Sequence, residues 1–255
     1  MKISCAILPS IQLKATNHAG SLHMSDDRRF FDDPFAESNP WPIRIYTLGR
    51  FEVLCGNEPL RFPRKVPRRP LLLLKAVIAF GCRNVSEDRL IDALWPEADG
   101  AAARMSLTSA IHRLRRLLTH GESIIRRENR ISLDQRYTWV DAWVAERLLE
   151  QSEQYGMMAN FGAMARSVWT AADLYKGEFL SGESRAHWAK PFASRLSRHL
   201  LRQLYSVGRH VEAADRAEDA IRCYERCLRI DPSTEDACRR LMAVAGTQKF
   251  LGLIQ

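Results

Sequence analysis

The chain has 255 residues, 46% of them hydrophobic, and a formal net charge of +8. This is enough apolar material for one large or two ordinary domains with buried cores. A membrane-spanning class is excluded because the longest apolar run is too short to cross a bilayer.

The positive charge is unevenly distributed along the chain. Residues 41–141 hold 18 basic and 11 acidic side chains, whereas residues 1–40 hold 4 and 5, and residues 142–255 hold 16 and 14. A basic excess confined to the middle of a chain is typical of a module that meets a polyanion.

The cysteines and the start of the chain indicate a cytoplasmic protein. The six cysteines, at positions 5, 55, 82, 223, 227 and 238, fit no disulfide framework, and no histidine or CxxC pair completes a metal site. We therefore expect small buried thiols, no metal and no cofactor. The start MKISCAILPSIQL is interrupted by Pro9 and Gln12 and lacks a signal-peptide cleavage site, and Met24 is as good a start as Met1.

Residues 1–40 are polar and proline-broken, which predicts a flexible tail or linker. After this tail, two short alternating runs, Ile43 to Leu48 and Phe51 to Val53, predict strands of a small antiparallel sheet. Gly49 and Gly56 mark the turns that end them.

Three helices are predicted next. Residues 70–80, PLLLLKAVIAF, begin with proline and are followed by glycine, which favours a helix that is apolar on nearly all sides and therefore central. Ser86 is the predicted N-cap of a second helix, which ends at Pro96. A third helix is expected to begin near Asp99 and to run through MSLTSAIHRLRRLL (105–118).

The third helix has one apolar and one basic face. At 100° per residue, one side is a stripe formed by Leu107, Ile111, Leu114 and Leu118. The opposite side has no acidic residue and carries Met105, Thr108, Ser109, His112, Arg113 and Arg116, with Arg104 and Arg115 on the shoulders. A merely solvated face normally mixes both signs of charge, so the pattern favours a face that meets an anion, with ordinary solvation as the alternative.

A basic β-hairpin is predicted after the third helix. SIIRRENRISLD alternates Ile125 against Ile131 and Leu133 around the turn Glu128-Asn129. Its arginines are Arg126, Arg127 and Arg130. A sheet, three helices and a basic hairpin, in this order, are the elements of a winged helix-turn-helix with an N-terminal sheet.

Residues 43–141 resemble the OmpR/PhoB-type winged helix as it occurs in SARP-type bacterial transcriptional activators. The resemblance is carried by LGRFEV, LIDALWP, SLTSAIHRLRRLL, and RISLD leading into YTWVDAW. It implies that helix 100–118 is the recognition helix and that hairpin 123–133 is the wing. We therefore assign residues 41–138 to an α+β winged helix-turn-helix DNA-binding domain.

Residues 139–255 are predicted to form an all-α, tetratricopeptide-like domain. A 34-residue unit fits from Leu201, with Gly208, Ala220, Tyr224 and Pro232 at its small, small, aromatic and proline positions. This half resembles the bacterial transcriptional activator domain that follows the winged helix in SARP-type proteins, also through LYKGEFLSG and ERCLRIDPSTEDACRRLM. We expect the domain to be truncated at its C-terminus, because a further helix usually follows and AVAGTQKFLGLIQ stops short.

The centre of a recognition helix reaches base edges in the major groove, whereas its shoulders reach phosphates. We predict base contacts from Met105, Thr108, Ser109, His112, Arg113 and Arg116. Phosphate contacts are predicted from Arg104 and Arg115, and from Arg64 and Arg68 in the extended run before the first helix. The wing residues Arg126, Arg127 and Arg130 are predicted to contact a minor groove or phosphates. Solvation is the alternative for each arginine.

No enzyme is predicted, because phosphate-binding glycine loops, a nucleophile elbow and paired metal-binding histidines are all missing from the sequence. Two functions remain. One is a sequence-specific transcriptional regulator, an activator with a phosphorelay-type output domain, located in the cytoplasm at the nucleoid. Its partners would be double-stranded DNA, RNA polymerase or other transcription proteins, and a second copy in a homodimer, but no membrane. The other is a helical-repeat adaptor without specific DNA binding. The basic excess of residues 41–141 favours the regulator, and this segment alone is expected to keep weakened DNA binding.

Overall fold

The computed structural model describes residues 41–62, 66–182 and 186–252, with side chains up to residue 246. The chain divides into two compact units, Met1–Asn39 and Pro40–Gln255. The predicted tail, both candidate start methionines and Arg64 lie outside the described residues. The description below concerns the second unit.

A four-stranded sheet in the order β3-β2-β1-β7 opens this unit. β1 (Ile43–Tyr46) and β2 (Glu52–Cys55) form the antiparallel pair predicted from their alternation, and β3 (Glu58–Pro59) extends it. The strand β7 (Thr138–Val140) joins the other edge in parallel to β1. Because β7 is short and buried throughout, it shows no alternation by which it could be predicted.

The three predicted helices are present. α1 (Arg68–Ala79) is buried along most of its length and begins two residues before Pro70. α2 (Glu87–Leu94) follows, and α3 (Gly100–Leu117) is preceded by its N-cap Asp99, whose side chain accepts a hydrogen bond from the amide of Ala102 at 2.8 Å. This bond caps the helix as expected of an aspartate in that position.

A second sheet, in the order β4-β6-β5, corrects two local predictions. β5 (Ile124–Arg127) and β6 (Arg130–Leu133) are joined by a two-residue turn. Both turn residues, Glu128 and Asn129, have positive φ (50° and 56°), as a tight hairpin turn requires. Ile124, rather than Ile125, is the buried isoleucine of β5. Ser86 lies in β4 (Val85–Ser86) and its side chain makes no capping hydrogen bond, although it occupies the N-cap position.

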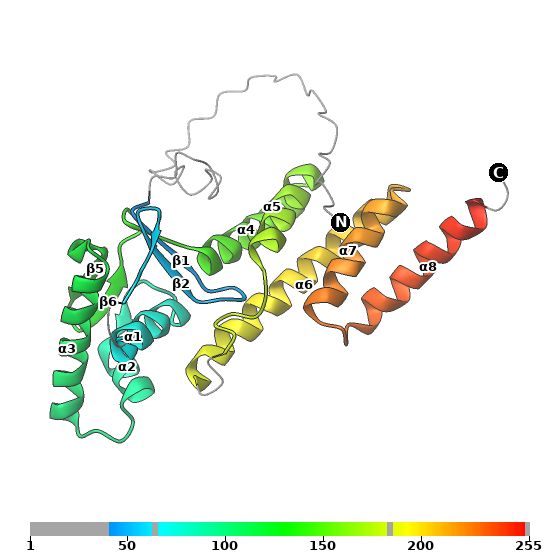
Figure 1. Ribbon diagram of the computed structural model, residues 1–255. Coiled ribbons are helices and arrows are strands. Elements are labelled where there is room, and N and C mark those ends of the chain that lie inside the picture. The colour runs from blue at the N-terminus through cyan, green and yellow to red at the C-terminus, as the bar shows by residue number, and fades with distance from the viewer. Residues whose placement is uncertain (1–40, 63–65, 183–185, 253–255) are drawn as a thin grey trace, which may run out of the picture. The chain divides into compact units, whose positions relative to one another are not determined.

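The rest of the unit is helical (Figure 1). Its helices are α4 (Asp141–Met157), α5 (Phe161–Leu174), α6 (Lys190–Ala213), α7 (Ala217–Ile230) and α8 (Glu235–Gly252), and short 3₁₀ helices lie at η2 (Gly121–Ser123) and η3 (His187–Ala189). α4 packs against α5, α6 against α7, and α7 against α8. Within the described residues, no helix is long and apolar enough to cross a membrane.

The predicted close packing of α6 and α7 is confirmed. Gly208 is buried in α6, and a Cβ atom there would lie 2.8 Å from the ring of Tyr224 in α7. Ala220, Cys223 and Cys227 are fully buried on the same helix as Tyr224. The small residue at 208 therefore lets the aromatic ring of α7 approach the backbone of α6.

Candidate nucleic-acid interface

The two faces of α3 lie as its periodicity predicted. The stripe residues Leu107, Ile111, Leu114 and Leu118 are buried. The six predicted base-contacting residues, Met105, Thr108, Ser109, His112, Arg113 and Arg116, are all exposed. Met105 is 72% exposed, which is unusual for a large apolar side chain and rules out packing into the core.

The arginines of α3 differ in their surroundings. Arg113 and Arg116 have no hydrogen bond or ion pair to any other described residue. Arg104 is exposed and lies 3.9 Å from Asp88, a surface pair of little energetic weight. Arg115 is half-buried and donates to the backbone oxygen of Ile124 at 2.9 Å, so it ties α3 to the hairpin. Of the two predicted shoulder residues, only Arg104 therefore presents its guanidinium to solvent.

Arg126 of the hairpin is bonded to other elements of the domain, although its side chain is partly exposed. Its Nε and Nη2 donate to the two carboxylate oxygens of Glu87 at 2.6 and 2.8 Å, and Nη1 donates to the hydroxyl of Thr108 at 3.3 Å. The hydrogen bonds to Glu87 raise the pKa of Arg126. Glu87 is buried at the start of α2, so Arg126 joins α2, α3 and the hairpin.

The other two hairpin arginines lie opposite each other. Arg127 and Arg130 are paired across β5 and β6, and both are exposed. Arg130 donates to the backbone oxygen of Asn84 at 2.9 Å. Arg127 has no bonded partner among the described residues. Arg127 is thus the wing arginine most available to an external anion.

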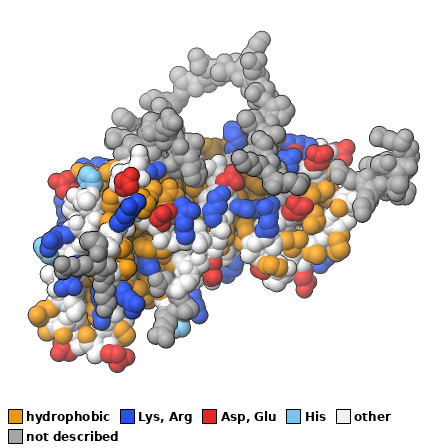
Figure 2. Space-filling model, in the orientation of Figure 1, with side chains coloured by type: hydrophobic (Ala, Val, Ile, Leu, Met, Phe, Trp, Pro, Cys, Tyr) orange, Lys and Arg blue, Asp and Glu red, His pale blue; other side chains and the backbone are white. Residues whose placement is uncertain are grey.

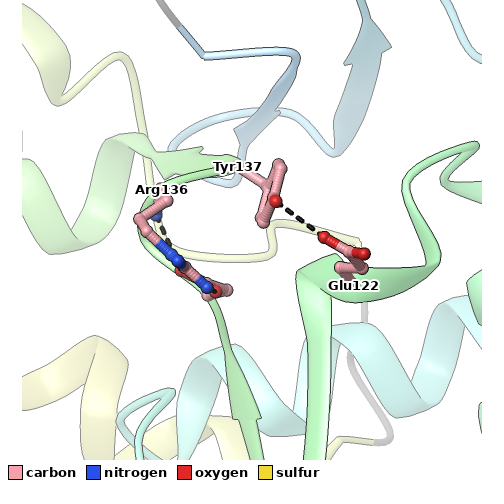
Figure 3. Close-up of polar contacts among 4 residues, drawn as sticks. Glu122, Arg136 and Tyr137 are labelled. Atoms are coloured by element: carbon pink, nitrogen blue, oxygen red, sulfur yellow. Dashed lines mark hydrogen bonds and ion pairs between the residues drawn. The ribbon is translucent and has the colours of Figure 1, made fainter.

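The base of the hairpin is cross-linked on the side away from the turn (Figure 3). The hydroxyl of Tyr137 donates to Glu122 at 2.7 Å, which raises the pKa of Tyr137 because the bond stabilises the protonated phenol. Arg136 donates to the carboxylate of Asp134 and lowers the pKa of that group. The Tyr137–Glu122 bond joins the segment after α3 to the segment before β7, whereas the Arg136–Asp134 pair lies within the segment before β7.

The start of α1 is basic and faces solvent in part. Arg68 is exposed in the first turn, as predicted for a phosphate contact, and no acidic residue lies in that turn. The guanidinium of Arg69 lies 5.7 Å from the ring centroid of Trp95. Cations and unsatisfied amides at a helix start both favour a bound anion.

The basic surface of the interface differs from that of the helical half. In Figure 2, blue and pale-blue side chains lie at the left of the view, where Figure 1 places α3, with red ones above and below them, and red and blue also alternate over the helices to the right. In the helical half this alternation includes ion pairs such as Arg195–Glu146 and Arg240–Glu212. The charges there neutralise one another, whereas those of Arg113, Arg116 and Arg127 do not.

Two buried carboxylates escaped the sequence analysis. Glu87 carried no site prediction, and its pairing with Arg126 joins residues 39 positions apart. Asp141 accepts hydrogen bonds from Thr47 and Leu48, which follow β1 and lie more than 90 positions away. Neither pairing leaves a local pattern in the sequence, because only the fold brings the partners together.

Comparison with protein families gives a match over the helical half. Residues 140–247 match the model of the bacterial transcriptional activator domain. The helical half is therefore similar to this family, and the predicted resemblance to SARP-type transcriptional activators is confirmed. Comparison with curated proteins finds none that matches.

The chain also shares its fold with a solved structure. This structure is described as Mycobacterium tuberculosis EmbR in complex with a low-affinity phosphopeptide; the TM-score is 0.63 and the sequence identity 20%. The alignment covers 80% of this chain and 54% of the EmbR chain, so the chain spans about half the length of that protein. The likeness extends beyond the activator domain, because 80% of the chain includes much of the α+β half.

Proposed function

We propose that the chain is a sequence-specific DNA-binding transcriptional regulator, and an activator. The α+β half is a winged helix-turn-helix in which α3 enters the major groove and the β5–β6 hairpin is the wing. The helical half contacts RNA polymerase or other transcription proteins, and a homodimer on DNA is a further part of the proposal.

The observation that carries the proposal is the outward face of α3. The face is exposed from Met105 to Arg116, no acidic residue lies in the helix, and two of its guanidinium groups have no partner among the described residues. An unpaired basic helix face is costly for a globular protein to keep unless it meets an anion, because like charges repel. The activator-domain match supports the same conclusion independently.

The proposal assigns different roles along the helix. Ser109 and His112, at the centre of the exposed face, read base edges by hydrogen bonding. Arg113 and Arg116 read guanine or bind phosphate, since a guanidinium suits both. Thr108 accepts a hydrogen bond from Arg126, which places its hydroxyl between the wing and the groove. Arg127 and Arg68 bind phosphates.

The test is a selection of DNA by the purified full chain. Sheared genomic duplexes from the source organism are mixed with the protein, and the retained fragments are sequenced. The proposal predicts one enriched sequence, and a variant with Ser109→Ala and His112→Ala should enrich it less or not at all. Retention without a common sequence, or no retention, would favour the adaptor function instead.

A further inference from the structure

The end of β1 is held by a buried carboxylate of the helical half. Asp141, the first residue of α4, is 2% exposed. The amide of Thr47 donates to both of its oxygens at 2.8 Å, the hydroxyl of Thr47 donates at 2.6 Å, and the amide of Leu48 donates at 3.0 Å. The amide of Ala142 adds a bond of 2.7 Å from the start of α4 itself.

A loop of the helical half holds residues 47–49 from another direction. The amide of Leu180 donates to the oxygen of Thr47 at 2.8 Å, and the amide of Gly49 donates to the oxygen of Glu178 at 3.1 Å. The hydroxyl of Ser181 donates to the oxygen of Gly49 at 2.9 Å. Leu48 and Phe179 form a β-bridge between these bonds.

Two glycines make this approach possible. A Cβ atom on Gly177 would lie 2.9 Å from the Cα of Gly49, and a Cβ atom on Gly49 would lie 2.9 Å from the backbone of Lys176. The backbones of the two halves therefore touch where neither residue has a side chain. Gly49 also has a φ of 85°, which favours glycine on its own account.

These contacts satisfy most of the backbone polar groups of residues 47–49, and the partners all belong to the helical half. Buried backbone groups are seldom left without partners, so the buried residues Thr47 and Leu48, which follow β1, depend on the helical half for their hydrogen bonds. We propose that Asp141 is a positioning residue, which holds the activator domain in one orientation on the DNA-binding half. This inference rests on the proposed function.

The chemistry of Asp141 suits this role because four donor groups converge on it and no acceptor does. An ionised carboxylate only accepts hydrogen bonds, whereas an asparagine would turn an NH₂ group toward one or more of these donors. Substitution by asparagine keeps the size of the side chain and removes part of the bonding. The orientation of the activator domain should then loosen, while α3, which lies elsewhere in the α+β half, keeps its exposed face.

The test uses the full chain with Asp141→Asn and, as a second variant, Gly177→Ala, which separates the two backbones without altering the carboxylate. Gly162→Ala in α5 is the matched control, because a Cβ there meets only the end of the Arg166 side chain at 3.7 Å. Three quantities are measured: affinity for the duplex that the wild type retains, transcription from a promoter carrying it, and hydrogen exchange of the amides of residues 47–49.

We expect both junction variants to lose about tenfold or more in activation, the size of a typical coupling between sites. DNA affinity should stay within about twofold, because the DNA-binding face is distant and independent, and the amides of residues 47–49 should exchange faster. If activation and amide exchange are unchanged in both variants, the inference is wrong but the proposed function stands. The same holds if the variants lose DNA binding and activation in parallel. A wild type that neither retains DNA nor activates would refute the proposed function, and the inference with it.

Discussion

Arg126 and Arg127 are neighbours in β5, and their guanidinium groups have opposite surroundings. That of Arg126 is paired with the buried Glu87 and reaches Thr108, whereas that of Arg127 faces solvent without a described partner. The alternation of a strand turns successive side chains to opposite sides, so one arginine serves the fold and the other is free to bind.

This difference predicts separable effects of two alanine substitutions. Arg126→Ala leaves the Glu87 carboxylate buried and unpaired, so the free energy of unfolding should fall by about 1–3 kcal/mol. Arg127→Ala should leave stability within about 0.5 kcal/mol of the wild type. It should instead weaken binding to all duplexes and lower the salt slope by about one unit. Chemical denaturation measures the stability of both variants, and duplex titration measures their DNA binding. If Arg127→Ala lowered stability and Arg126→Ala weakened DNA binding, the two faces of the hairpin would be the reverse of those in the structure.

A second pair of substitutions separates base reading from phosphate binding on α3. His112→Ala should cost about 1–3 kcal/mol of binding energy on the selected sequence and little on random DNA, because a base contact is lost. Arg116→Ala is the comparison. A contact of Arg116 with phosphate predicts that this substitution weakens binding to the selected and to random DNA by similar factors. Arg116 suits this role better than Arg115, whose guanidinium is engaged by Ile124. Competition titrations with selected and scrambled duplexes decide; a selective Arg116 and a uniform His112 would show that α3 is rotated in the groove.

At the scale of elements, α6 and α7 pack as a tetratricopeptide-like pair through one glycine. Gly208 leaves room for the Tyr224 ring, and the Tyr224 hydroxyl donates to Glu212 at 2.6 Å. Burial, together with this bond to a carboxylate, raises the pKa of Tyr224. The Tyr224 side chain therefore fixes the helix pair in two ways: its ring fits against Gly208, and its hydroxyl is hydrogen-bonded to Glu212.

Gly208→Ala should destabilise the chain although alanine favours helices. The new methyl would meet the ring at 2.8 Å, an overpacking that costs about 1–3 kcal/mol, against a helix-propensity gain of about 1 kcal/mol. Gly156→Ala in α4 is the control, since its nearest new contact is an ordinary 3.5 Å to the Met164 sulfur, and it should stabilise by about 0.5–1 kcal/mol. Thermal unfolding of the full chain compares them, and equal shifts would contradict the packing account.

Periodicity was enough to predict the elements that bury one face. The stripe of α3 lies where the 3.6-residue repeat places it, and Ala220 and Tyr224 of α7 are buried at the positions that the 34-residue unit gave them. It failed for Ile124 and Ile125, because two adjacent isoleucines leave the register of a short strand undetermined. The sequence also predicted which α3 residues are exposed. It could not show that Arg115 and Arg126 are engaged, since their partners come from other elements.

At the scale of the whole second unit, the two halves are less separable than their sequences suggest. Leu48 is 2% exposed and bridges to Phe179, and the ring of Phe80 lies edge-on to Trp188 with centroids 6.1 Å apart. A chain that ends at position 141 would lack Phe179 and Trp188, and so would lose both contacts. The structure therefore argues against the sequence-based expectation that residues 41–141 retain DNA binding alone.

A chain of residues 41–141 should accordingly unfold without a cooperative transition or aggregate, because Leu48 loses its bridge to Phe179 and the backbones of Thr47 and Gly49 lose their partners in residues 178–181. Circular dichroism during heating and size-exclusion chromatography measure this, with residues 41–255 as the control. A monomeric 41–141 fragment that melts cooperatively and binds the selected duplex nearly as tightly as the control would show that the halves fold independently.

The most direct test of the central claim is the salt dependence of duplex binding by the full chain, measured by fluorescence anisotropy. If six to eight phosphates are neutralised, log K should fall against log salt with a slope of roughly −5 to −7. Replacing Arg113 and Arg116 together by alanine should reduce that slope by up to about two units. A binding constant that does not change between low and physiological salt, or a slope that the double substitution leaves untouched, would contradict the account of α3 as the surface that meets DNA.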